Sequence, residues 1–190
     1  MTKALTISAL CFIAAIVITT IVLGFVNTNF AQFSVQESVS VEVWKNNKNQ
    51  LFYKDTNADE FNEIVNLYNK ESKVSILTAL FTGAYSVDAD IDNENTSMTN
   101  KITSGYWLVF KFDTAQTLKL NGENYKDKTA PSTDPIKFSK IYLQVTNTEG
   151  MALVNAYVCD SKTSTTAKHT MFIYANQTAL YNHISNLEIA

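Results

Sequence analysis

The chain has 190 residues, enough for one ordinary domain with an appended segment and too few for two domains of typical size. Hydrophobic residues make up 46% of it, which is ample for a packed core and excludes a disordered chain. All 15 basic residues are Lys and the net charge is −3, which argues against nucleic-acid binding, because that function favours Arg side chains and a basic face.

The N-terminal segment contains the longest apolar run of the chain. From Ala4 to Val26, 23 residues pass without a charge or a proline. As a helix rising 1.5 Å per residue, this run is about 34 Å long, enough to cross a bilayer core of about 30 Å. Residues 1–26 are therefore predicted to be a single-pass transmembrane helix that serves as an uncleaved membrane anchor.

A cleaved signal peptide, which would make the protein secreted, is the alternative for this segment. Signal peptides carry apolar regions of about 7–15 residues and a small-x-small cleavage site. The nearest fit, Asn29-Phe30-Ala31, has Asn where a small residue is needed. Lys3 precedes the run and residues 27–44 contain no Lys. Since flanking positive charges stay in the cytoplasm, we expect a cytoplasmic N-terminus and an extracytoplasmic remainder.

The exported part is predicted to be a tether over residues 27–36 and one domain over residues 37–190. Residues 38–54 predict a β-hairpin, because apolar and polar residues alternate in "SVSVEVW" and "KNNKN" supplies a turn.

Two helices are expected next. Asn57 and Glu60 resemble a capping box, and apolar residues then recur at helical spacing over residues 58–70: Phe61, Ile64, Val65 and Tyr68. A shorter helix is predicted for residues 72–82, with Gly83 as its stop, although a buried strand has a similar pattern.

The remainder of the chain is rich in predicted strands. "GYWLVFKFD" (residues 105–113) is typical of a central strand, and Asn121-Gly122 is a preferred hairpin turn. Further strands are predicted over residues 136–145, 151–159 and 169–175. A last helix spans residues 177–188, with one apolar stripe: Leu180, Ile184 and Leu187. Short connections between strands imply antiparallel pairing, so the predicted class is α+β, one mainly antiparallel sheet packed with two or three helices.

The acidic stretch "YSVDADIDNENTSM" (residues 85–98) is the most suggestive sequence for chemistry. It places carboxylates at every second position: Asp88, Asp90, Asp92 and Glu94. As a calcium loop it lacks Gly at position 6 and the bidentate Glu at position 12. Its strict alternation favours the solvated face of a strand, whose charges a neighbouring strand carrying Lys111 would offset. A loose divalent-cation site and paired catalytic carboxylates remain alternatives.

Other catalytic and metal chemistry finds little support in the sequence. Cys159 and His169 lie ten residues apart on neighbouring predicted strands, but a small, semi-buried cysteine is the simpler interpretation. His183 is predicted on the polar side of the last helix. The tight spacing of a zinc site and a Gly-rich phosphate loop are both missing, so no cofactor is expected.

Aromatic residues on strands, including Trp44 and Trp107, suggest either a carbohydrate- or peptide-binding face or simply core, and core is the commoner role. Together these features predict a membrane-anchored extracytoplasmic domain of the cell envelope that binds a partner, such as an envelope protein or the cell wall, without catalysis. The alternative is an envelope hydrolase that uses the acidic stretch.

Overall fold

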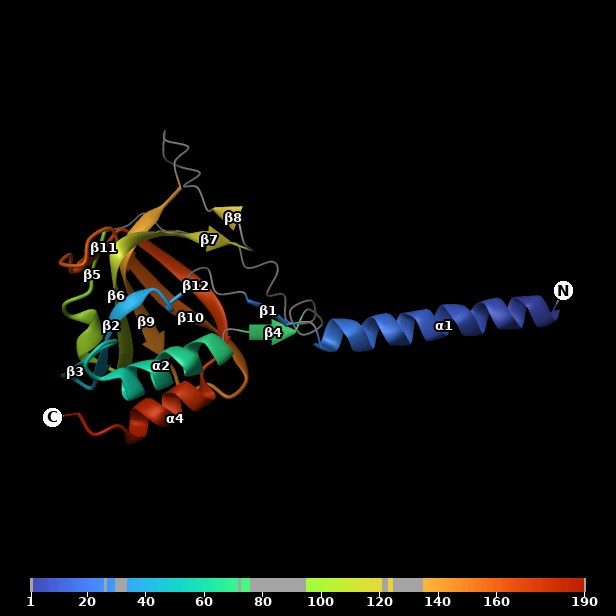
Figure 1. Cartoon of the computed structure of the whole chain (residues 1–190), viewed down its shortest axis with the longest axis horizontal. Helices are drawn as coiled ribbons and strands as arrows, with labels where there is room; N and C mark the ends of the chain where they lie inside the picture. Colours follow the sequence, from blue (N-terminus) through green and yellow to red (C-terminus); the bar gives the residue numbers. More distant parts are fainter. Residues whose placement is uncertain are drawn as a thin grey trace.

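The computed structural model describes residues 2–25, 27–29, 34–71, 73–75, 95–120, 123–124 and 135–189. They form an α+β fold with a six-stranded antiparallel sheet and three helices (Figure 1). The predicted class is confirmed at this level.

Apart from residues 27–36 and 72–82, the helices and strands follow the predicted order. The helices are α1 (Thr2–Phe25), α2 (Ala58–Glu71) and α4 (Thr178–Asn186), with a short 3₁₀ helix, η2 (Lys101–Thr103). The six-stranded sheet has the spatial order β12 (His169–Asn176), β10 (Met151–Cys159), β9 (Lys137–Val145), β6 (Tyr106–Thr117), β2 (Ser38–Lys45) and β3 (Lys48–Tyr53). Three short pairs accompany it: β1 (Asn27–Asn29) with β4 (Lys73–Ser75), β5 (Thr96–Ser97) with β11 (Thr166–Ala167), and β7 (Lys119–Leu120) with β8 (Glu123–Asn124).

The predicted hairpin of residues 38–54 is confirmed as strands β2 and β3. Its turn residues Asn46 and Asn47 have φ angles of 50° and 70°. Positive φ at both central residues is what a type I′ turn requires, and Asn tolerates this conformation better than most residues. The turn therefore directs β3 back along β2 with Trp44 opposite Asn49.

Helices α2 and α4 lie side by side across one face of the sheet (Figure 1). The predicted apolar stripes of both helices are buried in the main core: Phe61, Ile64, Val65 and Tyr68 from α2, and Leu180 and Ile184 from α4. The sheet contributes alternate residues of β6, Leu108, Phe110 and Phe112, all fully buried. Most of the buried apolar side chains lie on this helix-covered face of the sheet.

Glu60 does not complete the capping box suggested by the sequence. Its Oε1 lies 2.5 Å from Nε2 of His183, which joins α2 to α4. His183 is therefore on a contact between helices, where its side chain is 25% exposed, and not on an open polar face.

The opposite face of the sheet carries a second, smaller core. It contains Trp107 and Val109 from β6 and Tyr142 from β9, and residues from the segments around η2 and β11 cover it: Met98, Ile102 and Ala167. Because both faces of β6 are buried, the strand is apolar throughout residues 107–110, as expected for a central strand.

Two predicted segments differ from the observed structure. Residues 73–75 form strand β4, where the second predicted helix was expected to begin, and the remainder of that segment lies outside the described residues. Residues 27–29, at the start of the predicted tether, pair with β4, and Val35 near its end is fully buried in the main core.

Helix α1 confirms the predicted N-terminal helix and extends away from the sheet domain (Figure 1). Over the residues that the structure describes, no helix combines the length and the apolar character needed to cross a membrane. The prediction that α1 crosses a membrane therefore gains no support from this finding.

Candidate functional site

The register of the central strands places two lysines directly opposite each other on the face away from α2 and α4. One row across the sheet consists of Ser40 on β2, Lys111 on β6, Lys140 on β9 and Cys159 on β10. Like charges directly opposite each other across a sheet are destabilising. Such an arrangement needs compensation from other groups.

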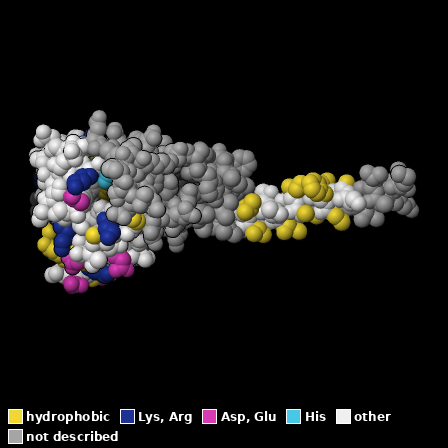
Figure 2. Space-filling model, turned by 90° about the horizontal axis from the view of Figure 1, so that it is seen from above, with side chains coloured by type: hydrophobic (Ala, Val, Ile, Leu, Met, Phe, Trp, Pro, Cys, Tyr) yellow, Lys and Arg dark blue, Asp and Glu magenta, His cyan; other side chains and the backbone are white. Residues whose placement is uncertain are grey.

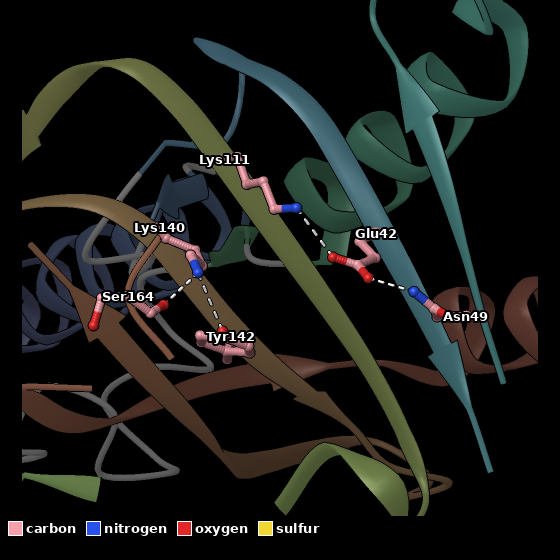
Figure 3. Close-up of polar contacts among 6 residues, drawn as sticks. All are labelled: Glu42, Asn49, Lys111, Lys140, Tyr142 and Ser164. Carbon is pink, nitrogen blue, oxygen red and sulfur yellow. Dashed lines mark hydrogen bonds and ion pairs between the residues drawn. The ribbon is translucent and has the colours of Figure 1, made fainter. Parts of the chain in front are cut away.

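The positive charge of Lys111 is balanced by a carboxylate. Its Nζ lies 3.1 Å from Oε2 of Glu42 on β2, and Oε1 of the same carboxylate accepts a hydrogen bond from Asn49 on β3 (Figure 3). Both side chains of the ion pair are partly exposed, at 27% for Lys111 and 16% for Glu42. Three neighbouring strands thus hold this pair.

Lys140 has no such partner, although it is only 4% exposed. Its Nζ donates to the backbone carbonyl of Ser164 and to Oη of Tyr142 at 3.3 Å, and lies 5.4 Å from the Tyr142 ring centroid (Figure 3). Among the described residues, no carboxylate oxygen lies within 4.0 Å of this ammonium. Burial lowers the pKa of Lys140 and the nearby Lys111 ammonium lowers it further, while Cys159 and the Glu42 carboxylate act in the opposite direction without cancelling the shift. Burying an ammonium that contacts only neutral acceptors costs free energy. An anion bound beside Lys140 would offset part of this cost.

These lysines line a cavity of about 440 Å³, here called the lysine pocket. Its polar lining consists of Glu42, Lys111, Lys140, Lys162, Thr163 and Thr165. Its apolar walls are Trp44, Ile102, Val109 and Tyr142. Lys162 is neutralised by Asp113, whose Oδ1 lies 2.7 Å away. The volume is in the range of small-molecule sites, which combine apolar walls with a few polar groups.

Trp44, a residue of the apolar wall, has a buried hydrogen-bond donor without a partner among the described residues. Its Nε1 is buried and has no hydrogen-bond partner in the described part of the chain. The other tryptophan, Trp107, donates its Nε1–H to the carbonyl of Ser104 at 2.9 Å. A buried donor without a partner costs about 1–3 kcal/mol, and the wall of the pocket carries this cost at Trp44.

A break in the alternation of β9 decides where Lys140 lies. Phe138 and Ile141 both belong to the helix-side core, although strict alternation would place them on opposite faces. The pairing of β6 with β9 is irregular here, with four residues of β6 between the partners of Lys140 and Phe138. Such bulges redirect side chains and are common beside functional sites. Without it, Lys140 would share the face of Phe138.

Comparison of the chain with protein-family models, with curated proteins and with solved structures gave no match in any of the three. The functional argument therefore rests on the structure itself.

A second, larger cavity of about 860 Å³ lies between the β2–β3 turn and residues 186–189. Lys45 in its lining donates to the carbonyls of Ser185 at 2.5 Å and Leu187 at 3.1 Å. A lysine at these carbonyls stabilises the C-terminus of α4, so its donors already have a structural role.

Residues 85–94 of the predicted acidic stretch lie outside the described residues, so Asp88, Asp90, Asp92 and Glu94 remain predictions. One part of that hypothesis is wrong: β6 is bordered by β2 and β9 over residues 106–111, so it has no free edge for a further strand. Lys111 instead pairs with Glu42. In the part of the chain that is described, no three His, Cys, Asp or Glu residues are arranged to hold a metal ion.

Cys159 and His169 lie near one another on paired strands, since Val158 is the register partner of His169. Cys159 is fully buried, more so than the sequence suggested. Burial raises the pKa of this thiol from 9.0 to about 11, which leaves little thiolate at neutral pH. The thiolate is the reactive form, so these residues do not favour a thiol enzyme.

This raised pKa predicts a loss of stability at alkaline pH. The unfolded thiol ionises first, so the contribution of Cys159 to folding is complete below pH 9 and is lost as the pH rises toward 11. Denaturant melts at pH 8 and pH 11 should show a smaller alkaline loss for Cys159→Ala than for the wild type. An equal loss in both proteins would contradict the assignment.

Sequence reasoning missed the lysine pocket. It considered Lys111 only as a neighbour of the acidic stretch, and it did not single out Lys140. A usable signal was present, because Lys140 interrupts the apolar strand "IKFSKIYLQV" at a position where alternation from Phe138 predicts core. A lysine at a predicted core position breaks the hydrophobic pattern of the strand, and such breaks are expected at functional sites.

Proposed function

We propose that this chain is a membrane-anchored binding protein of the cell envelope, with α1 as the anchor and the lysine pocket of its extracytoplasmic domain as the ligand site. The observation that carries the proposal is the exposure of the large apolar side chains of α1. Eight of them are exposed by half or more: Leu10, Phe12, Ile13, Ile16, Val17, Ile18, Ile21 and Val22. Figure 2 shows them spread along the described part of this helix. Side chains of this kind are costly in water and suit a lipid environment.

The length of the segment supports the same role. Side chains of α1 are described for residues 8–24, whereas the uncharged run extends from Ala4 to Val26. The 24 residues of α1 amount to about 36 Å of helix. Lys3 before the run favours a cytoplasmic N-terminus and an external domain.

Binding without turnover suits the chemistry of the lysine pocket. Its polar lining consists of lysines, threonines and the carboxylate of Glu42, which is engaged by Lys111 and Asn49. Neither His169 nor His183 lines it. Donors and apolar walls are suited to holding a ligand.

The anchor is tested by membrane fractionation of the full chain expressed in bacteria. We expect the wild type to stay in the membrane after carbonate washing, at its full 21.2 kDa. The double variant Ile13→Lys, Val17→Lys should be released, because each lysine at the centre of a span costs about 2.5–3.5 kcal/mol. The matched control Asn147→Lys, Asn182→Lys adds the same charge at exposed positions of the domain and should stay bound.

Orientation is tested on intact, wall-stripped cells, where external protease should degrade the domain. A wild type released by carbonate, or a shortened product that begins near Gln32, would overturn the anchor. The second result would favour a secreted protein.

A further inference from the structure

We propose that the lysine pocket binds the carboxylate of a small organic monoanion at the Lys140 ammonium, with Trp44 in the wall that contacts the apolar body of the ligand. This inference rests on the proposed binding function and adds the chemical class of its ligand. It begins from the charges around the pocket.

Three lysines line the pocket, and two of them are neutralised within the protein. Lys111 is paired with Glu42 and Lys162 with Asp113. Lys140 is the third, and the described residues give it only neutral acceptors. The surplus is therefore a single positive charge, which one carboxylate would balance. A doubly charged anion would exceed this surplus and be repelled by Glu42.

The donors of the pocket match a carboxylate. A lysine ammonium has three N–H donors, and two protein acceptors are assigned to Lys140. One N–H of Lys140 is therefore left for a ligand. Hydrogen bonds to an ionised acceptor are about twice as strong as neutral ones, so an anion gains most from this donor.

The walls indicate that the anion carries an apolar body. Trp44, Ile102 and Val109 line the same cavity, whose volume of about 440 Å³ leaves room for more than a carboxylate. An inorganic anion would leave these walls without contacts. An aryl or branched alkyl carboxylate fills both parts of the pocket.

Ligand binding can be measured directly through the indole N–H signals of the two tryptophans. In the full chain in detergent micelles, labelled with ¹⁵N at tryptophan, two indole N–H signals are expected because the sequence has two tryptophans. Benzoate should shift the Trp44 signal and leave that of Trp107, which is bonded to Ser104, unchanged. Trp44→Phe removes one signal and so assigns it.

Benzamide and inorganic phosphate serve as comparison probes, with empty micelles as the blank. We expect benzoate to bind at least tenfold more tightly than benzamide, which has the same shape without the charge, and phosphate to bind no better than benzamide. Lys140→Met should weaken benzoate binding at least tenfold. Lys168→Met removes a surface lysine outside the pocket and should change it less than twofold.

The outcomes separate this inference from the binding function itself. Equal binding of benzoate and benzamide at Trp44, or tighter binding of phosphate, would overturn the organic carboxylate and leave a ligand pocket. No shift with any probe would overturn both the carboxylate and the pocket as ligand site. If Lys140→Met does not fold, Trp44→Ala decides: it removes an apolar wall of the pocket and should weaken benzoate binding, measured by calorimetry, and unchanged binding would overturn the inference.

Discussion

Replacing Phe110 with Ala should lower the free energy of unfolding by about 3–5 kcal/mol. Phe110 is fully buried at the centre of β6, with strands on both sides and α2 above it. Its ring lies 5.8 Å from that of Tyr68 on α2, so the side chain joins the sheet to the helix layer. Truncation would leave a cavity lined by rigid neighbours, which collapse only partly.

The control for this substitution is Tyr53→Ala, an aromatic truncation on edge strand β3. Tyr53 is 49% exposed, so its loss should cost less than about 1 kcal/mol. Denaturant melts of the full chain in detergent measure both variants. Similar costs for the two would show that the helix-side core is not the main source of stability.

Replacing Ile184 with Ala should cost about 2–5 kcal/mol. Ile184 is fully buried in α4, which lies against α2 and β2. A helix of nine residues is marginal alone in water, so α4 depends on this docking. The substitution therefore removes buried methyl groups and loosens the helix that Lys45 and Glu60 hold at two further points.

Asn182→Ala is the matched control on the same helix. Asn182 is exposed, and its side chain lies off the apolar stripe, so the change should stay within about 0.5 kcal/mol. An unchanged melt for Ile184→Ala would mean that α4 is not part of the cooperative unit. Near-equal values for the two variants would lead to the same conclusion.

The stability of the sheet and the proposed ligand site are linked through β6. Phe110 supports the main core, while its neighbours Val109 and Lys111 point to the other face and line the lysine pocket. Side chains on one face of β6 therefore stabilise the main core, while those on the other face line the lysine pocket. A loosened β6 should disturb the spacing of Lys111 and Lys140, so Phe110→Ala is also expected to weaken benzoate binding.

The sequence by itself determined the local elements of this protein. Helices α2 and α4 were predicted because apolar residues recur at the helical period and can face one core. The β2–β3 hairpin was predicted because apolar and polar residues alternate before a polar turn segment, and the Asn residues of that turn adopt the positive φ that it needs. Short connections implied antiparallel pairing, and the sheet is antiparallel. All these signals depend on residues close together in the chain.

Only the tertiary structure decided which side chains meet. Glu42 and Lys111 are 69 residues apart, and Lys140 and Ser164 are 24 apart, so no local pattern joins them. Strand order brings β2, β6 and β9 together, and the segment after β10 covers the second face. The irregular pairing near Lys140 also reverses the face that alternation predicts. Side-chain direction in a sheet depends on register, and register depends on pairing across the whole chain, which is why the pocket emerged only in the folded protein.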